Sequence, residues 1–211
     1  MALSLGIVVG LDQEAQLARL MGTVAIGGGT FDGAMRAAEV LVTELKATAL
    51  MSFGIAGGLD PSLRPGDVLC ASEIMVDGQI IKATLSAKGL RQGRILGARA
   101  AVAGAAEKAA LWSETRAQCV DLESGAVALV ARRHRIPFGA MRAICDPAER
   151  SLPPVALIAL QDGSIRLGRV FGALLRRPGQ LPALLTLAQD ARKARLGLAR
   201  LRLAPEGDGL G

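Results

Sequence analysis

Aromatic side chains are scarce in this 211-residue sequence, which has four Phe, one Trp and no Tyr. Proteins that bind RNA or single-stranded DNA stack bases on such rings, so nucleic-acid binding of that kind is not expected. The core must instead consist of Leu, Val, Ile and Ala. Apolar residues make up 51% of the chain and charged residues 21%, which is the composition of a packed globular protein.

Patterns that would indicate metals, disulfides or membrane spans are also missing. The three cysteines, Cys70, Cys119 and Cys145, have no paired or metal-like spacing, and His134 is the single histidine. We therefore expect reduced thiols, no metal and no cofactor. The longest stretch without a charge, residues 47–59, has 13 residues, whereas a spanning helix needs roughly 18. A secretory signal has basic residues before its apolar stretch. No basic residue precedes the apolar start of this sequence, so a cytoplasmic protein is predicted.

The positive charge is concentrated near the end of the sequence. The net charge is +6, but residues 164–203 carry nine basic residues against the single acid Asp190, which leaves −2 for the rest. Apolar residues recur at helical spacing through 165–175 and 187–201, which predicts two amphipathic helices. Two interpretations stay open: packed surface helices with solvated arginines, or a basic face that contacts anionic lipid peripherally at the inner membrane. A third, nucleic-acid binding, has no recognised module in the sequence to support it.

Short apolar runs that end at glycines or turns predict buried strands, and a 3.6-residue period predicts the helices. The expected strands are 3–10, 23–26, 49–55, 67–76, 79–84 and 137–145, and the expected helices are 31–45, 123–133 and most of the chain after Pro153. Strands that alternate with helices indicate an α/β fold, a three-layer single domain with a mixed, largely parallel central sheet flanked by helices. We expect this domain to span 1–205, with a basic helical part from about 164 and a disordered tail at 206–211.

Polar or glycine-rich residues follow several of these strands. They are Asp12–Glu14, Gly54–Gly58, Asp121–Ser124 and Cys145–Asp146. Ligands of α/β sheets bind at the carboxyl ends of the strands. These four segments therefore predict a pocket at that edge of the sheet.

Three segments in this region carry a family signature. They are Ser52–Asp60 (SFGIAGGLD) continuing to Pro65–Val68 (PGDV), Asp121–Ser124 (DLES) continuing to Ile136–Phe138 and Arg142–Asp146 (RAICD), and Gly10–Ala15 (GLDQEA). The first two resemble the signatures of the nucleoside phosphorylase/nucleosidase superfamily. The third resembles, with a one-residue gap, the methylthioadenosine/adenosylhomocysteine nucleosidase branch. The resemblance covers residues 3–150 and implies a phosphorylase/hydrolase-like fold, homo-oligomers and cleavage of the base–ribose bond of a purine nucleoside.

Three further segments are similar to a narrower group. Ala106–Leu111, Asp146–Pro154 and Leu175–Pro182 resemble the hopanoid-associated phosphorylase subfamily. That resemblance implies a step of hopanoid side-chain synthesis in which adenine leaves adenosylhopane. The implied partner is a purine nucleoside, either lipid-linked or a small molecule.

The resemblance assigns chemical roles within the predicted pocket. Cleaving an N-ribosidic bond develops positive charge on the sugar, and the leaving purine must be protonated. Asp146 is the implied acid, although from the residues alone a cap for the following segment is the favoured interpretation. Glu14 is implied to orient or deprotonate the attacking water, with a solvated surface residue as the alternative. Glu123 is implied to accept hydrogen bonds from the ribose hydroxyls, to complement a helix dipole, or both.

Four more residues complete the implied substrate site. Leu122 replaces the Met of the family signature, a change that conserves volume. Gly57, Gly58 and Ile55 belong to the glycine turn, where glycines let the backbone approach the sugar or the nucleophile. A plain tight turn would need the same glycines.

The nucleophile follows from a departure from the phosphorylase pattern. Phosphate-using members that resemble this chain have an Arg before the glycine turn and a Ser or Thr within it. The corresponding positions are Ser52 and Ile55, and an Ile side chain cannot hold an oxyanion. Water is therefore favoured. Two alternatives stay open: phosphorolysis with a recruited arginine such as Arg36 or Arg64, and a non-catalytic membrane-surface module of the same fold.

Overall fold

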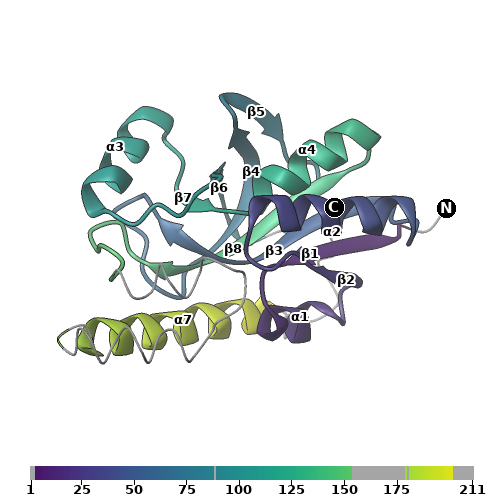
Figure 1. The fold of residues 1–211 in the computed structure, drawn as a ribbon. Helices are drawn as coiled ribbons and strands as arrows, with labels where there is room; N and C mark the ends of the chain where they lie inside the picture. The colour runs from purple at the N-terminus through teal and green to yellow at the C-terminus, as the bar shows by residue number, and fades with distance from the viewer. Residues whose placement is uncertain (1–2, 88, 154–178, 180, 202–211) are drawn as a thin grey trace.

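The fold is seen in a computed structural model, which describes residues 3–87, 89–153, 179 and 181–201. These residues form one mixed sheet with helices around it (Figure 1). The strands are β1 Leu5–Val9, β2 Thr23–Ile26, β3 Ala49–Gly58, β4 Val68–Val76, β5 Gln79–Lys82, β6 Arg91–Gly97, β7 Cys119–Asp121 and β8 Phe138–Asp146. The helices are α1 Asp12–Ala18, α2 Phe31–Thr43, α3 Ala105–Thr115, α4 Ser124–His134 and α7 Leu181–Leu201.

The central part of the sheet closes on itself. β3 pairs in parallel with β8, β8 pairs antiparallel with β4, and β4 runs parallel to β6. β6 is parallel to β7, which returns to β3 in the antiparallel direction. These five strands form a ring, which β1 and β2 extend on one side and β5 on the other. Parallel pairings predominate, so the predicted mixed, largely parallel sheet is confirmed, whereas the closed ring was not predicted.

Helices cover both faces of the sheet and give the predicted three layers (Figure 1). α2 and α4 pack on each other over one face, where Phe31 and Val127 belong to the larger core. α1 and α7 cover the opposite face, around Phe53 and Leu198. α3 lies at one end of the molecule, where its Trp112 is partly buried in a third, small cluster.

Local signals explain where several elements begin and end. The Thr30 hydroxyl caps α2 by accepting the Gly33 N–H at 3.2 Å. Asp77 and Gly78 both have positive φ, 49° and 73°, which is the backbone of the predicted hairpin turn between β4 and β5. The helix expected at 123–133 begins one residue later, because Glu123 is its N-cap.

The second predicted basic helix is present as α7. Its buried side includes Ala194 and Leu198. Asp190 is buried as well, and hydrogen bonds from Arg150 and Lys193 compensate its carboxylate for the loss of water. The first predicted basic helix, 165–175, and the tail at 206–211 lie outside the described residues. In the described part of the chain, no helix is long and apolar enough to cross a bilayer.

Candidate functional site

Four charged side chains from distant parts of the chain meet where the ends of β1 and β7 lie near the middle of β3 and β8. They are Glu14 at the start of α1, Asp121 at the end of β7, Glu123 before α4 and Arg142 within β8, and all four are buried. Strand pairing brings them together, since Val9 is opposite Phe53 and Gly54 is opposite Arg142. We call these four residues the charged cluster.

Arg142 is the centre of the charged cluster. Its guanidinium is fully buried, and it donates from Nε to Asp121 Oδ2 and from Nη2 to Ser52 Oγ. Nη2 also lies 3.5 Å from Glu123 Oε2. Its third nitrogen, Nη1, has no hydrogen-bond partner among the described residues. A buried N–H group without a partner is rare in folded proteins and indicates a site where a polar ligand or water binds.

Glu14 is buried, which rules out the alternative of a solvated surface residue. Its carboxylate accepts backbone N–H groups from Gly10 and Leu11, both at 2.9 Å, and from Ile55 at 3.0 Å. Burial raises the pKa of Glu14, while Arg142 and the three N–H donors act in the opposite direction. Burial is the largest of these effects, so the pKa of Glu14 is raised overall, and a carboxylate with a raised pKa is a stronger base.

Glu123 has a different environment from Glu14. Its Oε1 has no hydrogen-bond partner among the described residues. Burial raises its pKa to about 8, Arg142 opposes this effect, and Glu14 and Asp121 add to it. Three carboxyl groups therefore share one guanidinium, and this crowding of carboxyl groups favours the protonated form of Glu123.

Two glycines let these charged groups pack closely against the backbone. A Cβ on Gly54 would lie 2.7 Å from Glu14 Oε1 and 2.8 Å from Arg142 Nη1. A Cβ on Gly10 would lie 3.0 Å from Glu123 Oε1 and 3.1 Å from Glu14 Oε2. Any side chain at Gly54 would therefore displace Glu14 or Arg142.

Asp146 lies at the end of β8, where the ring of strands closes. Gly57 pairs with both Asp146 and Val120, so β7 and β8 meet across this glycine. The Asp146 carboxyl is 3% exposed, and a Cβ on Gly57 would be 3.2 Å from its Oδ1. Oδ1 also accepts the Cys145 thiol at 3.3 Å, and Oδ2 accepts the Lys108 ammonium.

The remaining predicted residues surround these two groups. Ile55 contributes its backbone N–H to Glu14, while its side chain is partly buried in the core under α1 and α7. Leu122 is half-buried between β7 and α4. Gly58 pairs with Cys119, and a Cβ there would lie 3.2 Å from the Asp146 carbonyl oxygen.

Three residues of this region received no role from the sequence: Asp121, Arg142 and Lys108. Asp121 was identified only as part of the segment that follows a strand. Arg142 is a charged residue in the middle of an apolar strand, a signal that could have identified it. Lys108 gave no comparable signal, because its helix is rich in alanine and its burial depends on the distant turn after Asp146.

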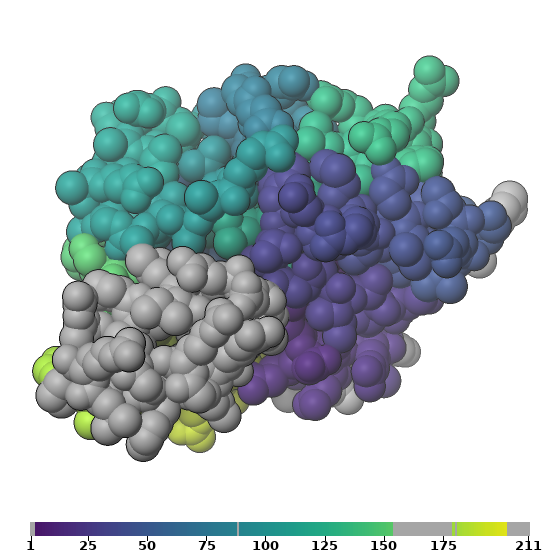
Figure 2. All heavy atoms as spheres, in the orientation of Figure 1, coloured from purple at the N-terminus to yellow at the C-terminus, as the bar shows by residue number. Residues whose placement is uncertain are grey.

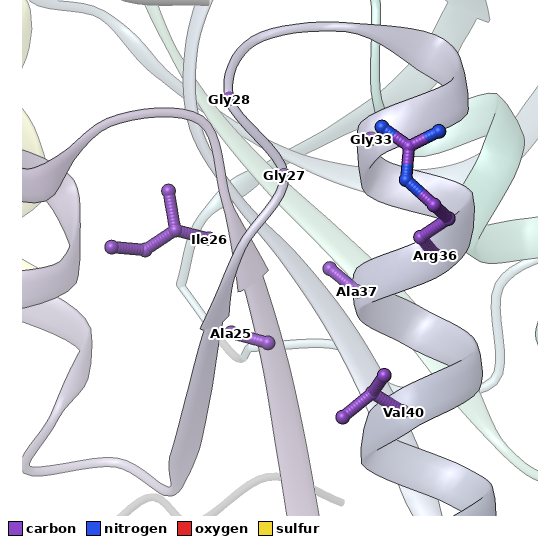
Figure 3. Close-up of a pocket in the computed structure, with 8 residues that line it drawn as sticks. All are labelled: Ala25, Ile26, Gly27, Gly28, Gly33, Arg36, Ala37 and Val40. Atoms are coloured by element: carbon purple, nitrogen blue, oxygen red, sulfur yellow. The ribbon is translucent and has the colours of Figure 1, made fainter.

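A separate hollow of about 420 Å³ lies between β2 and α2, away from Asp146. Figure 3 shows Ala37 and Val40 projecting from α2 toward β2, with Arg36 extending from the same helix. The hollow is lined by Ala25, Ile26, Gly27, Gly28, Gly33, Arg36, Ala37 and Val40. None of the charged cluster contributes to this surface.

Solved structures similar to this chain share its fold. The 5'-methylthioadenosine/S-adenosyl homocysteine nucleosidase of Campylobacter jejuni is 16% identical with a TM-score of 0.63, over 94% of this chain and 100% of its own. The same nucleosidase of Helicobacter pylori, with butyl-thio-DADMe-Immucillin-A, is 16% identical with a TM-score of 0.65, over 96% and 98%. The futalosine hydrolase of Helicobacter pylori is 15% identical with a TM-score of 0.64, also over 96% and 98%.

Sequence comparison identifies the family. No curated protein sequence is significantly similar to this chain. The family model described as the phosphorylase superfamily matches residues 23–89 and 78–176, which together are more than half of the chain. The match includes the glycine turn of β3 and the segment from Asp121 to Asp146. The chain therefore belongs to the phosphorylase superfamily, as the motifs predicted.

Proposed function

We propose that this protein hydrolyses the N-glycosidic bond of a purine nucleoside. The observation that carries the proposal is that an acid and a base lie beside two nearby residues of the same strand, β3. Gly57 of β3 adjoins Asp146, and the N–H of Ile55 holds Glu14. Two residues of a strand span about 6–7 Å, which leaves room for a sugar carbon between its leaving group and an attacking water.

Asp146 is the proposed acid. Its carboxyl lies against Gly57, where the missing side chain lets Asp146 and the backbone of β3 come close together. A purine leaves as a poor anion unless it is protonated, and a positioned acid contributes about 10²–10⁴-fold to such a step. The O–H bond of Asp146 breaks as the purine N–H bond forms, and the electrons of the C1'–N bond pass to the purine.

Glu14 and Arg142 are proposed to bind the attacking water. Glu14 Oε1 and Arg142 Nη1 both lie against Gly54, and one water bound by both groups would accept from the guanidinium and donate to the carboxylate. Glu123, with its unpartnered oxygen beside Gly10, is proposed to bind the ribose hydroxyls. Leu122, Gly57, Gly58 and Ile55 are proposed to line the rest of the substrate site.

The charge of this cluster favours water over phosphate as the nucleophile. The guanidinium of Arg142 already faces Asp121, Glu123 and Glu14, so a phosphate dianion would enter a region rich in carboxylates. The arginines suggested for phosphorolysis lie elsewhere: Arg64 donates to main-chain carbonyls, and Arg36 lines the hollow beside β2.

Adenine release measured with and without phosphate tests the mechanism. Hydrolysis gives the same rate in both buffers and a free sugar. A rate that requires phosphate, with a sugar 1-phosphate as the product, would establish phosphorolysis. Wild-type protein that releases adenine from no nucleoside under either condition would support the non-catalytic module.

The substrate is proposed to be lipid-linked, with adenosylhopane as the candidate from the sequence resemblance. The exposed side of α7 supports this, because Leu181, Leu185 and Leu196 are 48–56% exposed and share one helical stripe with the exposed Arg192. Adenosine with a long apolar 5' chain should react faster than adenosine. The protein should also sediment with anionic vesicles more than with neutral ones, and Leu185→Ser/Leu196→Ser should reduce sedimentation.

A homo-oligomer is proposed as well. Ile26 and Val40, at the hollow between β2 and α2, are 46% and 38% exposed, which is apolar surface that a second copy would cover. Light scattering should give a mass above 21.8 kDa for the wild type. Val40→Glu should lower that mass toward the monomer, and an unchanged mass would place the interface elsewhere.

A further inference from the structure

The only fully buried lysine among the described residues contacts the proposed acid. Lys108 is on α3, where the other residues except Thr115 are exposed or half-buried, and part of that helix surface is seen in teal in Figure 2. Its ammonium donates to Asp146 Oδ2, to the Pro147 carbonyl at 3.1 Å and to the Arg150 carbonyl at 3.0 Å. All three N–H donors are therefore used, and one is directed at Asp146.

Stability alone is a weak reason for burying this ammonium against a carboxyl group. Taking an ammonium out of water is costly, and a buried pair is seldom more stabilising than well-packed apolar residues of the same size. The carbonyls of Pro147 and Arg150 could equally be bound by water or by a neutral side chain. The positive charge has its specific effect on one group, the Asp146 carboxyl.

The two carboxyl oxygens of Asp146 have different hydrogen-bond donors. Oδ2 accepts from the Lys108 ammonium and Oδ1 accepts from the Cys145 thiol, while a Cβ on Gly57 would lie 3.2 Å from Oδ1 and 3.5 Å from Oδ2. The carboxyl is thus fixed in the orientation that presents Oδ1 to the strand ends. A group that must deliver a proton along one direction gains from such fixation.

We propose that Lys108 is a positioning residue that acts through Asp146 in protonation of the leaving purine; this inference rests on the proposed function. As the proton passes from Asp146 to the purine, a carboxylate forms, and the ammonium of Lys108 stabilises it without giving up its own proton. Hydrolysis is proton-neutral overall: the proton that Glu14 takes from water is released to solvent, and Asp146 regains one.

A positioning role and a structural role of Lys108 predict different rates for two substrates that differ in their leaving group. Lys108→Met should lower adenine release from the nucleoside that the wild type cleaves by about 100-fold or more. The same variant should lose less than about 3-fold on 4-nitrophenyl β-ribofuranoside, because nitrophenolate leaves without a proton. Lys82→Met, the same change at an exposed lysine, should leave both rates unchanged.

Purine release by a double variant also tests whether Lys108 acts through Asp146, and it needs only the nucleoside as substrate. Asp146→Asn should lose purine release to a similar extent, and Lys108→Met/Asp146→Asn should lose no more than Asp146→Asn does. If Lys108→Met fails to fold, Lys108→Gln keeps donors for the two carbonyls and removes the charge; failure of both to fold would show a structural lysine and overturn the proposal.

The outcomes distinguish this inference from the proposed function. A wild type that cleaves neither substrate would refute the proposed function, and this inference with it. A wild type that cleaves both, with Lys108→Met losing both rates equally, would refute only the role of Lys108. Independent, additive losses in the double variant would do the same.

Discussion

The substitution Glu123→Gln should change how the stability of this protein depends on pH. Burial raises the pKa of Glu123 from 4.5 to about 8. Below pH 4.5 the carboxyl is protonated in both the folded and the unfolded chain, so it has no effect on stability there. As the pH rises toward 8, the unfolded chain loses this proton while the folded chain keeps it, so the free energy of unfolding falls.

The size of the effect follows from the shift. Each pKa unit corresponds to about 1.4 kcal/mol, so a change from 4.5 to about 8 gives an upper bound of about 5 kcal/mol. Glutamine has a similar shape and no ionisable proton, so this part of the pH dependence should vanish. At pH 5 the wild type and Glu123→Gln should have similar stability, and at pH 8.5 the variant should be the more stable by several kcal/mol.

Urea unfolding at pH 5 and pH 8.5 measures both free energies. Glu44→Gln, the same substitution at an exposed position, is the matched control and should follow the wild type at both pH values. Equal pH dependence in the wild type and Glu123→Gln would refute the reasoning. It would mean that Glu123 is ionised in the folded protein over the whole range.

Three further substitutions test other parts of the molecule. Arg142→Met leaves Asp121 buried without its charged partner and should lower the free energy of unfolding by about 3–5 kcal/mol, as measured by urea unfolding. Gly54→Ala adds a Cβ 2.7 Å from Glu14 Oε1 and should lower kcat for adenine release at least about 10-fold while the protein still folds. Thr30→Ala removes the cap of α2 and should cost about 1 kcal/mol without changing kcat. Full activity in Gly54→Ala would contradict the proposed water site.

Much of the fold could be predicted because its signals are local. β2 has the predicted bounds, and the Asp77-Gly78 turn forms where the dipeptide indicated it. The middle of the chain could not be predicted for two physical reasons. The polar residues of β6 are satisfied by distant partners, as when Arg94 pairs with Glu73. The buried side of α3 consists of Lys108 and Thr115, the reverse of the usual apolar pattern.

The candidate site could be predicted only in part. The residues that end strands, such as Asp146, were identified because the carboxyl ends of strands meet at one edge of a sheet. Arg142 could not be placed, because its role depends on the register that sets it opposite Gly54. The closed ring of strands could not be predicted from the sequence either, since β7 has only three residues and no local signal indicates its antiparallel pairing with β3.

The most direct test of the account is adenine release in phosphate-free buffer by the wild type and by Asp146→Asn, with Asp32→Asn as an exposed control. The substrates are adenosine, 5'-methylthioadenosine and an adenosine with a long apolar 5' chain. The account predicts release by the wild type and by Asp32→Asn, and a rate about 10²–10⁴-fold lower in Asp146→Asn. Equal rates in Asp146→Asn and the wild type, or no release from any of the three by the wild type, would contradict it.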